Sequence, residues 1–217
     1  MAIIQSGADS TLLTVDPTFK AARVVIKPDE LTGAYQVGTA SGALTTVAAF
    51  TSTAGHVFAF RWAPGTGALC AIKRVSVGFV CTTAFGAAQQ MGFALYAARS
   101  YSGSHSGGTA VTLTGNNNKY RTSLATTGAT DVRIGSTTAL TAGTHTLDSQ
   151  PLGATYFWVA GVGTQLANTD LISYDATDYP LILANNEGFV IANTTLMGAT
   201  GVGSLVVNVE WFEASAY

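Results

Sequence analysis

Residues 71–98 constrain the fold more than any other stretch, because apolar side chains recur there at every second position. The regular apolar positions are Val75, Val77, Phe79 and Cys81 in the first half, and Met91, Phe93, Leu95 and Ala97 in the second. A period of two places each quartet on one face of a β-strand. We interpret the two halves as neighbouring central strands of a β-sandwich, and a crossing between two sheets is the alternative.

The same alternation recurs along the chain at the spacing expected of a sandwich. Residues 181–183 and 188–192 flank a short polar loop and predict a hairpin, and residues 204–213 predict the last strand. No long stretch has helical periodicity. We therefore predict an all-β fold, a jelly-roll-like β-sandwich over residues 46–217. Its expected core is Phe58, Phe60, Val75, Val77, Phe79, Phe93, Leu95, Val207, Val209 and Trp211.

The first 45 residues read differently and predict an extended N-terminal arm. Pro17 and Pro28 each remove a hydrogen-bond donor from any strand ladder, and a link rich in glycine, alanine and serine covers residues 33–44. Such an arm pairs with its own sheet or reaches a neighbour, and we predict the second. The expected contact residues are Leu12, Leu13, Val15, Phe19, Lys20, Arg23 and Lys27.

Residues 99–152 predict a loop-rich excursion at one end of the sandwich, since only short pieces such as 111–113 and 132–134 look capable of forming strands. Charged residues make up 10% of the chain, against about 25% in ordinary soluble domains. A surface so poor in charge is either buried against other subunits or a threonine-rich β surface without a partner.

Several classes of partner and location are disfavoured. The net charge is −2 and the basic residues are scattered, which argues against nucleic-acid binding. No apolar run reaches the roughly 18 residues of a membrane span, and the start lacks a secretory signal pattern, so we expect no membrane partner and folding in a cytoplasm. Cys70 and Cys81 would lie at opposite ends of one strand, too far apart for a disulfide.

No catalytic, cofactor-binding or metal-binding residue is predicted. The chain has no nucleophile elbow, and the nearest approach, residues 103–107, has His105 at its centre. His56, His105 and His145 lie about 40 to 50 residues apart and lack the spacing of paired metal ligands. Asp170, Asp175 and Asp178 favour Asx turns over a cation site.

Four tyrosines in expected loops raise the question of sugar binding, because exposed aromatic rings stack on sugars. These are Tyr101, Tyr120, Tyr174 and Tyr179. Core packing or interface anchoring is the favoured interpretation of each.

Four patches of the sequence resemble virion proteins of tailed bacteriophages. They are residues 18–24, residues 93–119 apart from a short gap, residues 183–191 and residues 207–211. The resemblance implies a non-enzymatic virion structural protein without a cofactor, made in the host bacterial cytoplasm. It is most like a decoration or cement protein, which binds the major capsid protein on the capsid exterior as a homotrimer and stabilises it. A tail or fibre component that attaches to the host surface is the alternative.

Overall fold

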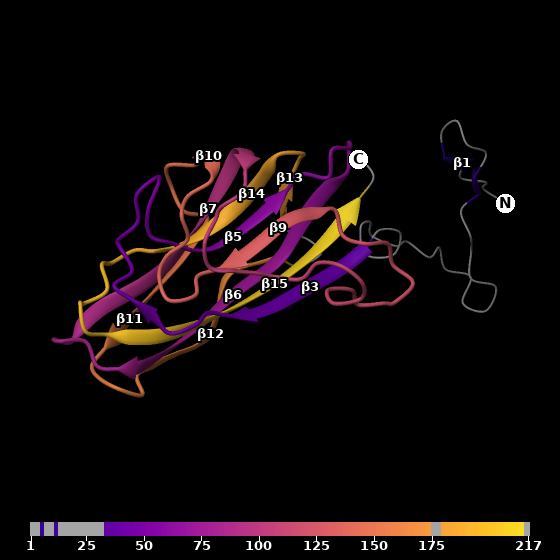
Figure 1. Ribbon diagram of the computed structural model, residues 1–217. Helices are drawn as coiled ribbons and strands as arrows, with labels where there is room; N and C mark the ends of the chain where they lie inside the picture. Colours follow the sequence, from indigo (N-terminus) through magenta and orange to yellow (C-terminus); the bar gives the residue numbers. More distant parts are fainter. Residues whose placement is uncertain (1–4, 7–10, 13–32, 175–178, 215–217) are drawn as a thin grey trace, which may run out of the picture.

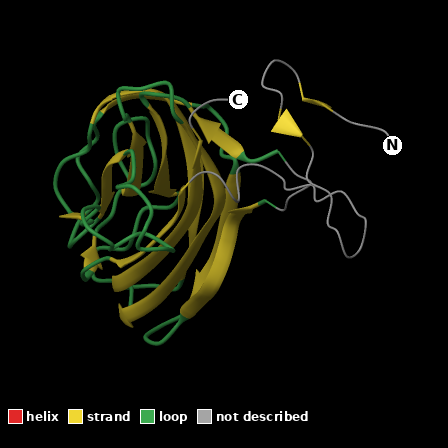
Figure 2. Cartoon of the chain, turned by 90° about the vertical axis from the view of Figure 1, so that its right-hand side faces the viewer, coloured by secondary structure: helices red, strands yellow, loops and turns green. Residues whose placement is uncertain are grey.

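The computed structural model describes residues 5–6, 11–12, 33–174 and 179–214. Two antiparallel sheets pack against each other (Figures 1 and 2), which confirms the predicted all-β sandwich. The jelly-roll connectivity stays a prediction. Within the described ranges, no helix has the length and apolar character needed to cross a membrane.

The larger sheet has seven strands and is called the seven-stranded sheet. Six of them follow the order β10-β7-β14-β5-β9-β8, and the seventh, β11, pairs with β7 beside β10. Its strands are β5 (His56–Trp62), β7 (Gln89–Gly103), β8 (Thr109–Ala110), β9 (Ala129–Ile134), β10 (Thr144–Leu147), β11 (Gly153–Val159) and β14 (Glu187–Asn193).

The six-stranded sheet has the order β12-β6-β15-β3, with β13 paired to β6 and β4 paired to β15. Its strands are β3 (Gly33–Ala40), β4 (Leu44–Thr45), β6 (Leu69–Thr83), β12 (Gln165–Ser173), β13 (Leu181–Leu183) and β15 (Val202–Ala214). β1 (Gln5–Ser6) and β2 (Thr11–Leu12) form a separate two-stranded sheet.

The core lies between the two large sheets, and the ten predicted core residues are all buried in it. Aromatic rings from both sheets meet there. Phe60 of β5 stacks on Phe189 of β14 at 5.2 Å between ring centroids, and its ring meets the edge of Trp211 of β15 at the same distance. The period-two patterns of β5, β6, β7 and β15 therefore identified the faces that meet.

Two predicted pairings are wrong. β6 and β7 lie in opposite sheets, so residues 71–98 cross between the sheets rather than forming neighbouring strands. Residues 181–183 and 188–192 do not form a hairpin either, because β13 pairs with β6 whereas β14 pairs with β5 and β7. Alternation fixes which side chains face inward, and it carries no information about which strand lies alongside.

The predicted link over residues 33–44 is also wrong at its start, because β3 pairs with β15 along eight residues. Tyr35 and Val37 are buried while Gln36 and Gly38 are exposed. The Tyr35 ring stacks on Trp211 at 5.7 Å. Residues 33–40 therefore belong to the sandwich, and the predicted arm boundary at residue 45 is too late.

Most of the residues predicted to form the subunit contacts of the arm lie outside the residues that the structure describes. Leu12 is the second residue of β2, which pairs with β1. The other six residues lie outside the described ranges: Leu13, Val15, Phe19, Lys20, Arg23 and Lys27. Their role in subunit contacts stays a prediction.

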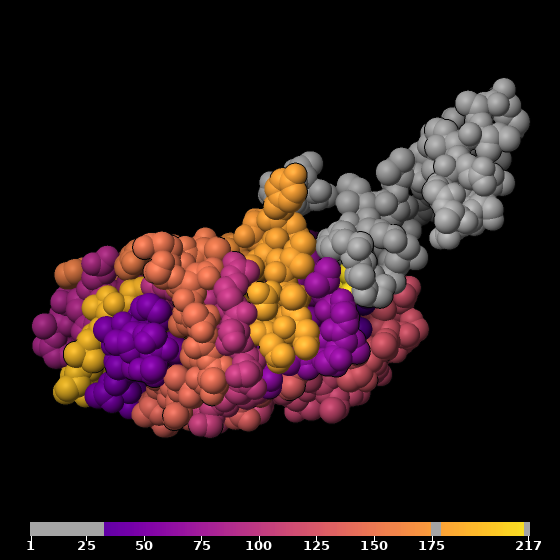
Figure 3. Space-filling view, turned by 90° about the horizontal axis from the view of Figure 1, so that it is seen from above, coloured from indigo at the N-terminus to yellow at the C-terminus, as the bar shows by residue number. Residues whose placement is uncertain are grey.

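The excursion over residues 99–152 covers a sheet as well as forming loops. Residues 132–134 belong to β9 as predicted, while residues 111–113 lie outside the strands. Phe50, Leu140 and Leu147 pack on the outer face of the seven-stranded sheet, where Ala59, Ala94, Tyr96, Val190 and Ala192 form a second apolar cluster. Figure 3 shows segments from distant parts of the sequence side by side on the molecular surface.

Candidate metal centre

The three histidines of the chain converge at one place. His56 is the first residue of β5, His105 follows the end of β7 by two residues, and His145 is in β10. One ring nitrogen of each lies within 4.8 Å of the ring nitrogens of the other two. The long sequence spacing argued against paired ligands, yet the topology brings all three together.

Strand pairing explains part of this convergence. β10 pairs with β7 so that His145 lies opposite Tyr101, and the register shifts on both sides of the pair His145–Thr146. Such irregularities turn the side chains of a strand away from strict alternation. Tyr101 is consequently buried beside the histidines, with its ring 5.3 Å from that of His145.

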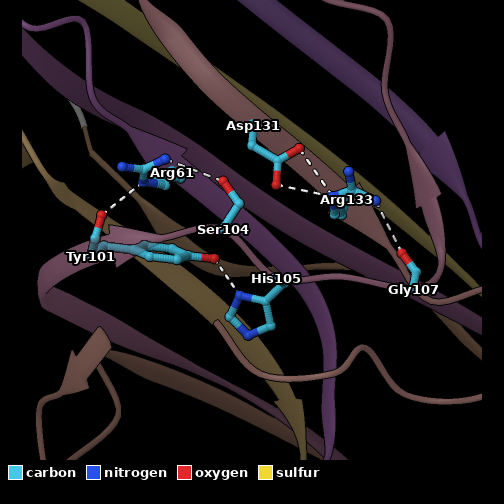
Figure 4. A network of polar contacts seen from close by, with 7 residues as sticks. All are labelled: Arg61, Tyr101, Ser104, His105, Gly107, Asp131 and Arg133. Atoms are coloured by element: carbon cyan, nitrogen blue, oxygen red, sulfur yellow. Dashed lines mark hydrogen bonds and ion pairs between the residues drawn. The ribbon is translucent and has the colours of Figure 1, made fainter. Parts of the chain in front are cut away.

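Two arginines hold the loop that carries His105 (Figure 4). Arg61 of β5 donates hydrogen bonds to the carbonyl oxygens of Tyr101 at 2.7 Å and Ser102 at 2.9 Å, and to Ser104 Oγ at 3.2 Å. Arg133 of β9, paired with Asp131, donates to the carbonyl oxygen of Gly107 at 3.2 Å. These bonds fix the loop on both sides of His105.

The hydrogen bonds of the rings define which nitrogens can serve as ligands. His56 Nε2 lies 3.2 Å from the carbonyl oxygen of Thr51, and His145 Nδ1 lies 2.9 Å from that of Gly143. A carbonyl oxygen only accepts, so these two ring nitrogens carry the protons. His56 Nδ1 and His145 Nε2 therefore present lone pairs.

His105 is the ring whose proton can move. Its Nε2 lies 2.8 Å from His56 Nδ1, and its Nδ1 is hydrogen-bonded to the Tyr101 hydroxyl. Because His56 Nδ1 is an acceptor, His105 Nε2 carries a proton when no metal is bound. A metal at Nε2 would require the other tautomer, in which Nδ1 donates to the Tyr101 oxygen. Outer hydrogen bonds of this kind orient metal-binding histidines.

The environment favours uncharged imidazoles. His56 is 0% exposed and His105 is 2% exposed. Burial lowers the pKa of His56 to about 4 and that of His105 to about 3, with the neighbouring histidines as a second cause. Both rings are therefore neutral at pH 7, which is the form that binds metals.

One ligand atom is left without a partner. His145 Nε2 is buried and has no hydrogen-bond partner among the described residues. An orphaned buried polar atom costs about 1–3 kcal/mol, and a metal ion in the centre would satisfy it. Imidazole nitrogen suits zinc, copper, nickel and iron, and three protein ligands leave a further position for water.

The other residues weighed from the sequence are dispersed. Asp170 forms an ion pair with Arg74 at 2.8 Å, while Asp175 and Asp178 lie outside the described ranges. Cys70 and Cys81 are buried and unbonded to each other, as predicted. The sequence signal that could have found the centre is weak: one histidine within a glycine- and serine-rich loop.

Comparisons with known protein families, with curated proteins and with solved structures found no match to this chain.

Proposed function

We propose that the protein binds one late transition-metal ion, of the zinc, nickel or copper type, through His56 Nδ1, His105 Nε2 and His145 Nε2. The observation that carries this proposal is the convergence of the three nitrogens within 4.8 Å, with the second nitrogen of each ring hydrogen-bonded to an outer group. Histidines that bind metals in other proteins also form a hydrogen bond through the second ring nitrogen.

The role that fits this geometry is structural. The metal would join three segments that are distant in sequence: the start of β5, the loop after β7 and β10. The rings of His56 and His105 are buried and only His145 is partly exposed, which favours a structural ion over one that meets a substrate. A metal in such a site contributes its binding free energy to folding.

The test uses tag-free protein, stripped with a chelator and titrated with Zn²⁺, Ni²⁺ and Cu²⁺ in a calorimeter, with the bound metal counted by mass spectrometry. We expect one ion per chain. His105→Ala and His145→Ala should lower the affinity at least 100-fold, and Tyr101→Phe about 10–100-fold through the lost outer hydrogen bond. Tyr156→Phe on β11, outside the centre, is the matched control.

Two results would contradict the proposal. The first is wild-type protein that takes up less than one ion per chain. The second is binding that survives the loss of His105 or His145. Either would leave the three rings as a metal-free hydrogen-bonded cluster.

A second proposal concerns assembly: the chain is a non-enzymatic virion structural protein, a homotrimeric decoration protein on the capsid or, alternatively, a tail or fibre component. Its support is the sequence resemblance, the low charge, and two aromatic side chains on β11, Tyr156 and Trp158, which are 57% and 60% exposed. Large exposed aromatics are typical of interfaces. Copy number in purified particles tests it: hundreds support decoration, a handful a tail position, and absence contradicts both.

A further inference from the structure

A groove of about 660 Å³ lies on the six-stranded sheet, on the face turned away from the core. Its floor is formed by β3, β15 and β6, and a wall comes from the segment after β8. Six of its polar lining residues lie on four different strands: Gln36, Arg74, Ser76, Asn168, Asn208 and Glu210.

The strand register arranges these side chains in two rows across the sheet. Glu210 of β15 lies opposite Gln36 of β3 on one side and Arg74 of β6 on the other. The neighbouring row runs from Gly38 through Asn208 to Ser76. Adjacent rows of donors and acceptors on one face of a sheet are held in place by the strands beneath them.

The second row is already ordered by its own hydrogen bonds. Asn208 Nδ2 donates to Asn168 Oδ1 at 3.3 Å and to Ser76 Oγ at 3.4 Å. Asn208 Oδ1 turns to the opposite side, because a Cβ atom at Gly38 would lie 3.0 Å from it. The glycine thus leaves an acceptor and open space in the middle of the groove.

The charges of the groove disfavour an anionic ligand. Arg74 is bound to Asp170 at 2.8 Å, so its charge is matched. Glu210 makes no hydrogen bond or ion pair within the part of the chain that the structure describes. One cation beside two carboxylates gives a net negative surface, which repels phosphate and sulfate.

Tyr120 borders the groove and is 53% exposed. Its backbone N–H donates to the carbonyl oxygen of Ala34 on β3 at 3.2 Å, two residues from Gln36 of the groove. Burial raises the pKa of Tyr120, with the Glu210 carboxylate as a second cause, while Arg74 lowers it. A partly exposed tyrosine offers an apolar ring face and a polar tip to the same ligand.

We propose that this groove binds a neutral glycan. A sugar hydroxyl is both a donor and an acceptor, so adjacent hydroxyls need a mixed set of partners such as Glu210, Asn208 and Gln36. The apolar face of a sugar ring suits the exposed ring of Tyr120. A peptide that adds a strand to the sheet would lie along the outer edge of β3, the terminal strand, whereas this groove lies over the face of β3, β15 and β6.

The test is an array of immobilised neutral oligosaccharides built from glucose, galactose, mannose or N-acetylglucosamine, with sulfated and sialylated glycans included. Calorimetry with the strongest neutral oligosaccharide follows. We expect binding to neutral glycans. Glu210→Gln, which keeps the shape of the side chain, and Tyr120→Ala should each weaken it at least tenfold. Gln165→Ala, an exposed site on β12 outside the groove, should leave it unchanged.

The measurements are repeated in chelator with the full chain, which separates this site from the metal centre, and thermal unfolding verifies that each variant is folded. Three results would overturn the proposal: no binding to any neutral glycan on the array, stronger binding to the anionic glycans, or equal binding by wild type and the two groove variants.

Discussion

Phe93 illustrates how much one core side chain stabilises this sandwich. Its ring is buried between Phe79 of β6, at 5.8 Å between centroids, and Phe157 of β11, at 6.0 Å. We expect Phe93→Ala to lower the free energy of unfolding by about 3–5 kcal/mol, because truncation removes apolar burial and leaves a cavity. Denaturant unfolding measures it, and a loss below about 1 kcal/mol would contradict the assigned burial.

Glu213 makes the stability of the folded protein depend on pH. Its carboxylate accepts hydrogen bonds from the Trp211 indole at 3.0 Å and the Gly128 amide at 3.1 Å. Burial raises its pKa, although these hydrogen bonds oppose the effect. The folded protein therefore keeps a proton that the unfolded chain releases from about pH 4 upward, and stability falls as pH rises through that window.

Glu213→Gln removes this titration while keeping an oxygen acceptor. We measure the stability of wild type relative to that of the variant by urea unfolding, and we expect it to decrease as the pH rises above about 4. The opposite slope would mean that the hydrogen bonds outweigh burial in setting the pKa.

At the scale of single elements, β3 shows what sequence patterns can and cannot predict. Alternation in β5, β6, β7 and β15 identified strands, because those segments carry four or more large apolar residues. β3 has only Tyr35 and Val37 among small residues, so its composition looks like a link. Its strand structure comes from pairing with β15 and from the stack on Trp211, both of which are distant in sequence.

Two substitutions in β3 test this assignment. Tyr35→Ala removes the stack and the hydrogen bond from the Tyr35 hydroxyl to the carbonyl oxygen of Ala125 at 3.0 Å. We expect it to lower the free energy of unfolding by about 3–5 kcal/mol. Gln36→Ala, on the exposed face of the same strand, should cost less than about 1 kcal/mol. Equal costs would mean that β3 does not alternate between core and solvent.

The convergence of the three histidines could not have been predicted from the sequence for a related reason. They come from β5, β10 and the loop after β7, and the pairing of β10 with β7 places His145 beside Tyr101. That pairing depends on register shifts, and the position of His105 depends on hydrogen bonds from Arg61. Spacing rules for metal ligands describe local motifs and miss ligands assembled by tertiary structure.

At the scale of the whole molecule, a bound metal should act as a cross-link between β5, β10 and the loop after β7, three segments that are distant in sequence. A ligand that binds only the folded state stabilises it by about 2.7 kcal/mol at 100 times its dissociation constant. We expect Zn²⁺ in that excess to raise the unfolding temperature of wild type, as measured by calorimetry. His145→Ala should show no such rise, and a rise that persists in this variant would place the stabilising ion elsewhere.

The outer face of β11 predicts self-association. Among the described residues β11 pairs with β7 and lies beside β12 of the other sheet, and Tyr156 and Trp158 project from its solvent-exposed face. A strand face bearing large exposed aromatics suits contact with a second copy of the chain. We expect concentration-dependent association in sedimentation velocity, weakened by Trp158→Ser and unchanged by Gln165→Ala. Wild-type protein that stays monomeric at high concentration would show that this face has no partner in a second copy.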